Sequence, residues 1–413
     1  MSHISQSHKK WQIFGLDETG PEQLRQWHKQ ALSEADLVIA DRRFHEMLHP
    51  FADTRPLEAW PKPFSELASR LAPYQDKQVA IFTTGDPLIY GAGVSVKRLF
   101  PAQDISLWPA LSGLQLAAAH MAWPLPQSQI ISIHGRGVRK ILPHIYPFAK
   151  WLVVPQNASS VHEVAGLLVE HGCGEAAMSY LGGLGRKDHE IAIRKTAREW
   201  QDSAVETLSD FFILAVDLAP CGRFAHYGRF GALPDEAFIS DGKLTKQDAR
   251  ASAISKLQPH PKGVLWDLGT GCGSIAIEWA RHDESCVAHG VDNRDDRLDR
   301  ARANALALGT PEVRWHKDDI IAKMADLPVP DAIFIGGGLS EEAIRAALTH
   351  LPAGGRLVCH AVTLESEALL LSAHKNYGGH LVRLTVHKAD PVGAYYGWRG
   401  LMPVTQWALV KEG

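Results

Sequence analysis

Short runs of apolar and β-branched residues alternate with amphipathic helical patterns along nearly the whole chain of 413 residues. One helical pattern places Leu24, Trp27, Ala31 and Leu32 on a single face. Because strands that alternate with helices form largely parallel sheets covered by helices, the sequence predicts an α/β fold. The runs that predict strands in the first half are Trp11–Leu16, Leu37–Ala40, Val79–Phe82, Ile130–Ile133, Trp151–Val154 and Phe211–Val216.

A stretch rich in glycine and proline interrupts this alternation between Ala219 and Pro234. It has no apolar period that would support a helix or a strand, which is typical of a linker. After it the alternation restarts, with a helix predicted over Thr245–Leu257 and a strand over Val264–Asp267. We therefore expect one domain over residues 1–218, a linker over 219–233 and a second domain over 234–413, both of ordinary domain size.

Charge and cysteine content exclude several classes of protein. The chain has 43 Lys and Arg against 46 Asp and Glu, so it lacks the basic excess typical of nucleic-acid binding. Its five cysteines form no C-x-x-C pair, which predicts free thiols in a reducing cytoplasm, without a metal site. Neither a signal peptide nor a run near the ~18–20 apolar residues of a membrane span is present, so we expect no membrane partner.

One stretch in the carboxy-terminal half joins a predicted buried strand to a helix through a turn of three glycines. It reads Val264-Leu-Trp-Asp-Leu-Gly-Thr-Gly-Cys-Gly-Ser274. Gly269, Gly271 and Gly273 let the backbone approach a ligand closely and adopt conformations that other residues resist. Their spacing differs from the G-x-G-x-x-G of dinucleotide-binding enzymes, which predicts a site without a pyrophosphate. An acid at the strand end, Asp267, suits the ammonium group of an amino acid.

Acidic residues follow the next two predicted strands as well. Cys286–Val291 leads to Asp292, where an acid accepts both hydroxyls of a ribose. Val313–His316 leads to Asp318 and Asp319, where an acid reaches an adenine amino group. Together the three strand ends predict a site for S-adenosylmethionine, with Asp318 as the third acid and Asp319 as its alternative. A glycine turn alone is equally typical of a tight strand–helix connection.

Further motifs in this half carry a family resemblance. They are Pro234–Phe238, Thr245–Arg250, Pro330–Gly338 and Ala361–Glu365. With the glycine turn they resemble the methyltransferase domain that methylates carbon 15 of a precorrin and decarboxylates its ring C acetate in cobalamin synthesis. The resemblance covers residues 233–413 and implies a Rossmann-like class I methyltransferase fold. The glycines that end the third motif, Gly336–Gly338, are either part of the ligand site or only a tight turn.

The amino-terminal half has a Gly-Asp-Pro corner after a predicted strand. Alone it is a common turn, but three motifs together resemble the tetrapyrrole (corrin/porphyrin) methylase family, in its precorrin carbon-5 branch. These motifs are Ile81–Gly91, Trp108–Ala117 and Ile131–Arg136. The resemblance covers residues 10–218 and implies two α/β subdomains with S-adenosylmethionine in the cleft between them. The residues it assigns to the cofactor are Gly85, Asp86, Pro87 and Ser112.

Two unlike methyltransferase folds in this order resemble the bifunctional precorrin methyltransferases. The resemblance implies methylation of precorrin-6B at carbons 5 and 15 with decarboxylation to precorrin-8X, one S-adenosylmethionine per domain, and a homo-oligomer. Methyl transfer to an electron-rich carbon requires positioning rather than a protein nucleophile, so no catalytic signature is expected. Arg136 either binds a substrate carboxylate or ties down a loop. The side chains that could move protons or hold carboxylate arms are His134, Arg136, Lys246, Arg250, His360 and Glu365.

Two other functional classes fit parts of the sequence. One is a methyltransferase that acts on a nucleic acid through an amino-terminal binding domain, or on another small molecule. The near-neutral charge argues against the nucleic acid. The other is a non-catalytic tetrapyrrole carrier, against which two intact cofactor motifs argue.

Overall fold

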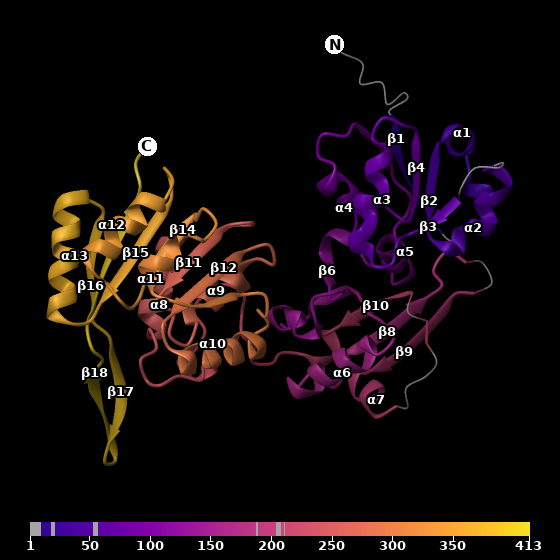
Figure 1. Ribbon diagram of the computed structural model, residues 1–413. Helices are drawn as coiled ribbons and strands as arrows, with labels where there is room; N and C mark the ends of the chain where they lie inside the picture. Colours follow the sequence, from indigo (N-terminus) through magenta and orange to yellow (C-terminus); the bar gives the residue numbers. More distant parts are fainter. Residues whose placement is uncertain (1–9, 18–20, 53–56, 187–188, 204–207, 210) are drawn as a thin grey trace, which may run out of the picture. The chain divides into compact units, whose positions relative to one another are not determined.

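The computed structural model describes residues 10–17, 21–52, 57–186, 189–203, 208–209 and 211–413. The chain divides into two compact units, each with its own sheets (Figure 1). The first contains residues 1–135 and 148–222, and the second contains residues 136–147 and 223–413. Residues 136–147 therefore pack with the second unit, although they lie well inside the predicted amino-terminal domain.

The first unit begins with a parallel five-stranded sheet in the order β3-β2-β4-β1-β5. Its two faces are buried in separate apolar cores, one around Phe14, Leu32 and Phe82 and the other around Trp11 and Ile81. The strands are β1 (Trp11–Leu16), β2 (Leu37–Ala40), β3 (Leu57–Ala59), β4 (Val79–Thr84) and β5 (Ile105–Trp108). The helices are α1 (Gln26–Glu34), α2 (Arg42–Leu48), α3 (Leu67–Leu71) and α4 (Ala92–Leu99).

A second five-stranded sheet completes this unit in the order β6-β7-β10-β8-β9. Helix α5 (Gly113–His120) packs Leu114 and Ala117 against it, beside Leu152 and Ile213. Only β6 and β7 are parallel. The expectation of parallel sheets is wrong here: β10 runs antiparallel to both of its neighbours, and the connection between β8 and β9 is too short for the crossover that a parallel pair needs. The remaining elements are β6 (Gln129–Ser132), β7 (Lys150–Val154), α6 (Ser160–Glu170), β8 (Ala177–Gly182), β9 (Ile191–Thr196), α7 (Ala197–Asp202) and β10 (Phe212–Asp217).

The second unit is built on a seven-stranded sheet in the order β13-β12-β11-β14-β15-β19-β16. Its first five strands are parallel, and β19 lies antiparallel between β15 and β16. This is the expected Rossmann-like architecture. Its strands are β11 (Val264–Leu268), β12 (Val287–Asp292), β13 (Arg314–Lys317), β14 (Ala332–Ile335), β15 (Arg356–Ala361), β16 (His380–Leu384) and β19 (Val404–Val410). Its helices are α8 (Gln247–Leu257), α9 (Ser274–His282), α10 (Asp295–Ala307), α11 (Ile320–Met324), α12 (Glu341–His350) and α13 (Leu364–Tyr377).

A separate two-stranded hairpin follows β16 in this unit. It pairs β17 (His387–Val392) with β18 (Tyr395–Gly400), and Leu401 N donates to Val386 O at 2.8 Å at its base. Figure 1 shows the hairpin extending away from the seven-stranded sheet. Among the described residues, no helix combines the length and apolar character needed to cross a lipid bilayer.

The second half of the predicted linker is fixed to the second unit rather than extended between domains. Arg281 Nη2 donates to Tyr227 O at 3.0 Å and to Gly228 O at 3.2 Å. Arg229 Nη2 donates to His282 O at 3.1 Å, and Leu233 is buried. Main-chain acceptors, which composition does not reveal, hold this segment in place.

Residues 136–147 are tied to the same unit by both charge and packing. Lys140, nearly buried in the 3₁₀ helix η6 (Val138–His144), forms an ion pair with Glu312. The neighbouring Ile141 is fully buried. Any side chain at Gly309 would place its Cβ 2.6 Å from Cδ of Pro143, so this glycine permits the close contact.

Candidate cofactor sites

The three acidic strand ends of the second unit lie at one edge of its sheet. Strand pairing aligns Asp267 of β11 with Gly290 of β12, and Asp292 with Lys317 of β13. The glycine turn, Asp292 and Asp318 therefore follow three adjacent parallel strands at their carboxyl ends. This is the edge at which open α/β sheets bind ligands.

The three glycines of the turn have different roles. All have positive φ angles, of +70° at Gly269, +57° at Gly271 and +84° at Gly273. A Cβ at Gly269 would lie 2.5 Å from Gly337 O, and one at Gly273 would lie 2.6 Å from the Trp315 ring. A Cβ at Gly271 would meet nothing within 4 Å. Gly269 and Gly273 thus permit internal packing, whereas Gly271 leaves space where a ligand can approach the backbone.

Asp292 is held by its surroundings, with 2% of its side chain exposed. Its Oδ2 accepts a hydrogen bond from Gly271 N at 3.0 Å, and its Oδ1 accepts one from Arg294 N at 3.1 Å. Arg297 Nη1 lies 3.5 Å from Oδ2. The carboxylate is therefore joined directly to the one glycine of the turn that faces open space.

Asp267 braces the turn from inside the protein. Its Oδ2 accepts hydrogen bonds from Thr270 Oγ1 at 2.6 Å and from Ala276 N at 3.1 Å. Burial raises the pKa of this carboxyl to about 6, although both hydrogen bonds oppose the shift. These two hydrogen bonds let Asp267 hold the strand–turn–helix connection, and its predicted role toward the ammonium group of an amino acid stays a prediction.

The third strand end separates its two acids. Asp319 caps helix α11, because its Oδ1 accepts from Ile321 N at 2.9 Å and from Ala322 N at 3.1 Å. Asp318 is half-buried, and its Oδ1 accepts from Asp319 N at 2.9 Å. Since Asp319 is committed to the helix, Asp318 is the better candidate for a ligand.

The turn of the first unit is built mainly from main chain. A Cβ at Gly15, in β1, would lie 2.0 Å from Gly85 O and 2.6 Å from Ala110 N, so three strand ends meet there without side chains. Gly85 has a φ of +61°, and its Cβ would lie 2.9 Å from Cα of Ser112. Ser112 caps α5 in a reciprocal capping box with Gln115. The structure thus brings Gly85 and Ser112 together.

The rest of the predicted corner is fixed locally. Asp86 Oδ1 accepts a hydrogen bond from Leu88 N at 2.7 Å, and Pro87 is buried. Its carbonyl would lie 2.7 Å from a Cβ at Gly91 or Gly93, so these glycines allow α4 to begin close to the corner.

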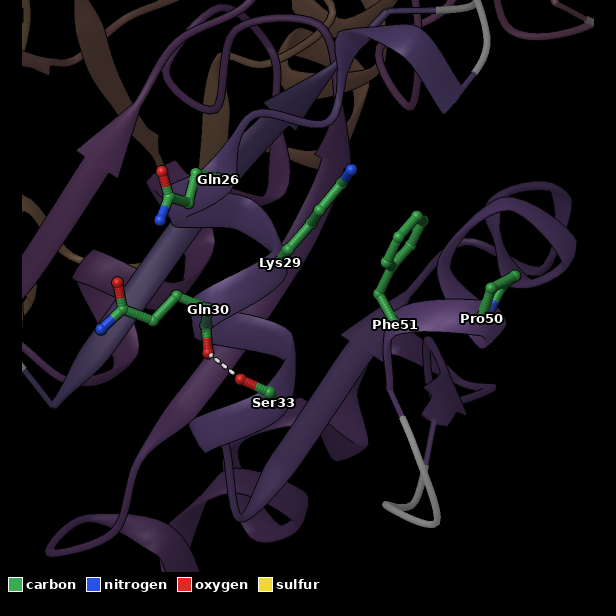
Figure 2. A pocket seen from close by; sticks show the side chains of 6 residues that line it. All are labelled: Gln26, Lys29, Gln30, Ser33, Pro50 and Phe51. Carbon is green, nitrogen blue, oxygen red and sulfur yellow. Dashed lines mark hydrogen bonds between the residues drawn. The ribbon is translucent and has the colours of Figure 1, made fainter.

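A separate surface hollow of about 420 Å³ lies between α1 and the chain after α2 (Figure 2). Lys29 Nζ lies 4.6 Å from the centre of the Phe51 ring across it. Its lining contains none of the residues predicted to bind the cofactor: Gln26, Lys29, Gln30, Ser33, Pro50 and Phe51.

Comparisons with known proteins agree with both halves of this description. A family model for the precorrin methyltransferase domain matches residues 236–411, and one for tetrapyrrole (corrin/porphyrin) methylases matches residues 20–200. A precorrin-6Y C(5,15)-methyltransferase [decarboxylating] of Sinorhizobium sp is 33% identical over 97% of this chain and 96% of its own length. One from Mycobacterium tuberculosis is 32% identical over 97% and 99%. The chain belongs to this family.

Membership of the precorrin-6Y C(5,15)-methyltransferase family makes the chain an S-adenosylmethionine-dependent methyltransferase. Among solved structures, the carboxy-terminal domain of the Rhodobacter capsulatus precorrin-6Y C5,15-methyltransferase is 37% identical. The match between the two covers 44% of this chain and 98% of the solved domain, with a TM-score of 0.42.

Two of the predicted catalytic candidates are interior residues of this family member. Arg250 is fully buried and donates from Nε to Glu278 Oε1 at 2.5 Å, with further bonds to Asp235 and to main-chain oxygens. His360 bonds Gln406 Oε1 at 2.9 Å, and burial lowers its pKa to about 4. Both side chains are thus held inside the second unit by partners of their own, and their role toward the substrate stays a prediction.

The other candidates are at the surface or half-buried. Arg136 pairs with Glu284 at 3.3 Å within the second unit, which favours the loop-anchoring alternative for it. His134 is exposed in the first unit, with its Nδ1 3.3 Å from Pro155 O. Lys246 is half-buried before α8, and Glu365 is exposed in the first turn of α13, just beyond the carboxyl end of β15.

Sequence reasoning missed an apolar surface at the same edge of the sheet. Strand pairing aligns Ile335 of β14 with Cys359 of β15, so the turn after β14 lies beside the residues after Ala361. There Val362 is 53% exposed and Leu364 is 81% exposed, and Met402, which precedes β19, is 69% exposed. We call Val362, Leu364 and Met402 the apolar shelf. The exposure of these three residues could not be predicted from the sequence, because single exposed apolar residues leave no periodic pattern.

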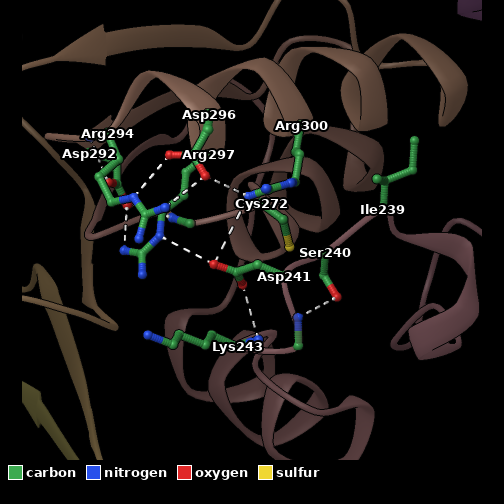
Figure 3. A network of polar contacts seen from close by, with 12 residues as sticks. Ile239, Ser240, Asp241, Lys243, Cys272, Asp292, Arg294, Asp296, Arg297 and Arg300 are labelled. Atoms are coloured by element: carbon green, nitrogen blue, oxygen red, sulfur yellow. Dashed lines mark hydrogen bonds and ion pairs between the residues drawn. The ribbon is translucent and has the colours of Figure 1, made fainter.

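Sequence reasoning also missed a network of charged residues around Asp292 (Figure 3). Arg297 of α10 lies between Asp292 and Asp241, with its Nε 3.6 Å from Asp241 Oδ2. Arg300 lies on the same helix and pairs with Asp296 at 3.0 Å. The spacing of Arg297, five residues after the strand-end acid, was the available signal.

Proposed function

We propose that the chain methylates precorrin-6B at carbons 5 and 15 and removes the ring C acetate carboxylate, which gives precorrin-8X in cobalamin biosynthesis. One observation carries the proposal: two unlike methyltransferase folds share one chain, each with a glycine turn at the carboxyl edge of a parallel sheet. We assign carbon 5 to the domain over residues 1–218 and carbon 15 with decarboxylation to the domain over 234–413.

Each domain would hold one S-adenosylmethionine. In the second, the residues fit the cofactor, because open space beside Gly271 adjoins a strand-end carboxylate that suits ribose hydroxyls. Asp318 would take the adenine amino group. In the first domain, Gly85, Asp86, Pro87 and Ser112 would line the site. When bound, the cofactor supplies a methyl group on a sulfonium centre.

The chain's own contribution is position. The acceptor carbon belongs to a reduced macrocycle that is already electron-rich, so holding it in line with the methyl group supplies much of the rate. The apolar shelf supports this role, since a flat ring presents an apolar face. Glu365, beside Leu364, would stand close enough to the acetate arm to move a proton.

The direct test is mass analysis after incubation of the full chain with precorrin-6B and S-adenosylmethionine. The product should gain two methyl groups and lose one carbon dioxide. Methyl transfer to an RNA or to another small molecule, with precorrin-6B unchanged, would overturn the proposal. Binding of precorrin-6B without turnover would instead support a carrier.

The shelf has its own test. Val362→Asp should weaken binding of precorrin-6B while leaving the affinity for S-adenosylhomocysteine unchanged, because a carboxylate would face both the apolar ring and its anionic arms. The matched control is Val329→Asp, where an equally apolar side chain is 71% exposed before β14, at the opposite edge of the sheet. Equal loss in both variants would contradict the shelf.

We also propose that the chain forms a homo-oligomer through the hairpin of β17 and β18. Tyr395, Tyr396 and Trp398 are 79%, 77% and 78% exposed there, and a two-stranded ribbon is at best marginally stable alone. Substituting all three by Ser should reduce the mass measured by light scattering to that of one chain. If the wild-type chain already has that mass, this proposal fails.

The five free cysteines fit a cytoplasmic location.

A further inference from the structure

Arg297 occupies an unusual position between two carboxylates of different exposure (Figure 3). Its Nη1 lies 3.5 Å from Oδ2 of Asp292, which is almost completely buried. Its Nε lies 3.6 Å from Oδ2 of Asp241, which is 25% exposed. Both distances are longer than a good charge-assisted hydrogen bond, so the guanidinium is shared rather than committed to either acid.

Asp292 has too few acceptor positions for its present donors and a ribose together. An ionised carboxylate offers about four lone-pair sites. Gly271 N, Arg294 N and Arg297 already direct donors at this one. Two ribose hydroxyls would bring the donors to five, so one must leave. The two main-chain donors are fixed by the turn and by the start of α10, and Arg297 makes the longest of the three contacts.

Asp241 is well placed to receive the displaced guanidinium. Its Oδ1 accepts a hydrogen bond from Lys243 N at 3.1 Å, which orients the carboxylate. The loop is anchored two residues earlier, where Asn304 exchanges hydrogen bonds with both polar groups of Ile239 at 2.8 and 2.9 Å. The same amide donates to Cys272 O at 3.0 Å, so the loop and the glycine turn share one fixed support.

We propose that Arg297 is an exchangeable counter-ion for the ribose-binding carboxylate. It neutralises Asp292 while no nucleoside is bound, and moves fully to Asp241 when ribose hydroxyls take its place. Asp241 is thereby a positioning residue for the nucleoside although it does not touch it. This inference rests on the proposed cofactor site in the second domain.

The test is a double-mutant cycle on the full chain, read by titration calorimetry with S-adenosylhomocysteine. Asp241→Asn keeps the oxygen that accepts from Lys243 but removes the charge that receives Arg297. It should weaken one component of the isotherm about three- to fivefold, the size of a partly exposed ion pair. Arg297→Gln should bind at least as tightly as the wild type, because no cation competes with the ribose. In the Arg297→Gln background, Asp241→Asn should have no further effect.

Two controls separate this mechanism from loop damage and from failure of the site. Arg302→Gln removes an exposed arginine that pairs with Asp299 on the same helix, and should change nothing. An S-adenosylhomocysteine analogue without ribose hydroxyls should not respond to Asp241→Asn. Equal weakening by Asp241→Asn in both backgrounds, or weaker binding by Arg297→Gln, would overturn the inference while leaving the cofactor site intact. If Asp292→Ala also leaves every component unchanged, the proposed site itself is wrong, and the inference falls with it.

Discussion

The two glycine turns solve the same problem with different groups. In the first unit, Gly15, Gly85 and Ala110 bring main chain against main chain, and a serine hydroxyl caps the following helix. In the second unit, Asp267 and Asp292 hold the turn through their carboxylates. A glycine turn can therefore be held in place either by close packing of main chain or by hydrogen bonds to buried carboxylates. The second arrangement should respond to pH and to loss of single charges.

The largest effect should come from adding a methyl group where main chains touch. Gly269→Ala and Gly85→Ala should each destabilise their own unit by about 3 kcal/mol or more, because positive φ and a backbone clash act together. Gly271→Ala is the matched control, with positive φ but open space, and should cost about 1–2 kcal/mol of stability. Denaturant unfolding measures all three. Equal losses would show that the three glycines do not differ.

Asp292→Ala should separate the two activities. A lost charge-assisted hydrogen bond costs roughly 1.5–3 kcal/mol, so one cofactor site should weaken about 10–150-fold. The product should keep its acetate and gain a single methyl group, as mass analysis would show. Asp296→Ala, an exposed acid near the start of α10, is the control and should leave the product unchanged. A product with both methyl groups would refute the assignment.

Asp267→Asn should expose the pH dependence of the charged turn. The folded pKa of about 6 lies above the ordinary aspartate value of 3.8, so the stability from the protonated carboxyl is complete below pH 4 and lost as pH rises through 6. The variant should therefore gain about 2 kcal/mol relative to the wild type between pH 4 and pH 7.5. Urea unfolding at both pH values measures the difference, and a constant difference would contradict it.

The smallest effect concerns the uncharged turn. Ser112→Ala removes the cap of α5 and should cost about 1 kcal/mol of stability. Thr196→Ala removes the equivalent cap of α7 in the same unit, and should cost as much. Only Ser112→Ala should also weaken cofactor binding. If calorimetry finds both or neither weakened, Ser112 is a cap and nothing more.

Local pattern was sufficient for most of the fold. The predicted strand before the glycine turn ends within one residue of the end of β11. The helix predicted over Thr245–Leu257 is α8, which begins two residues later than predicted, at Gln247, and ends at the predicted residue. These elements follow from apolar periodicity and turn residues close to them in sequence. Alignment of Asp292 and Asp318 at one edge also followed, since successive parallel strands end together.

Partners distant in sequence could not be predicted. Arg250 looked available because its motif is polar, but Glu278 and carbonyl groups of the chain before α8 surround it. Lys140 has its partner at Glu312, in the other half of the sequence. No periodicity or spacing encodes such pairs. For the same reason the sequence boundary at 219–233 missed residues 136–147.

That segment has a consequence for the synthesis of the chain. Gly309 and Glu312 are synthesised roughly 160 residues after the segment 136–147 that they contact. At about 5–20 residues per second, this separation is a delay of roughly 10–30 s. Throughout this time Leu142 and Pro143 lack the chain around Gly309 that lies against them in the finished protein. The nascent chain therefore exposes apolar residues of the segment 136–147 to chaperones and to neighbouring ribosomes before its carboxy-terminal half has been synthesised.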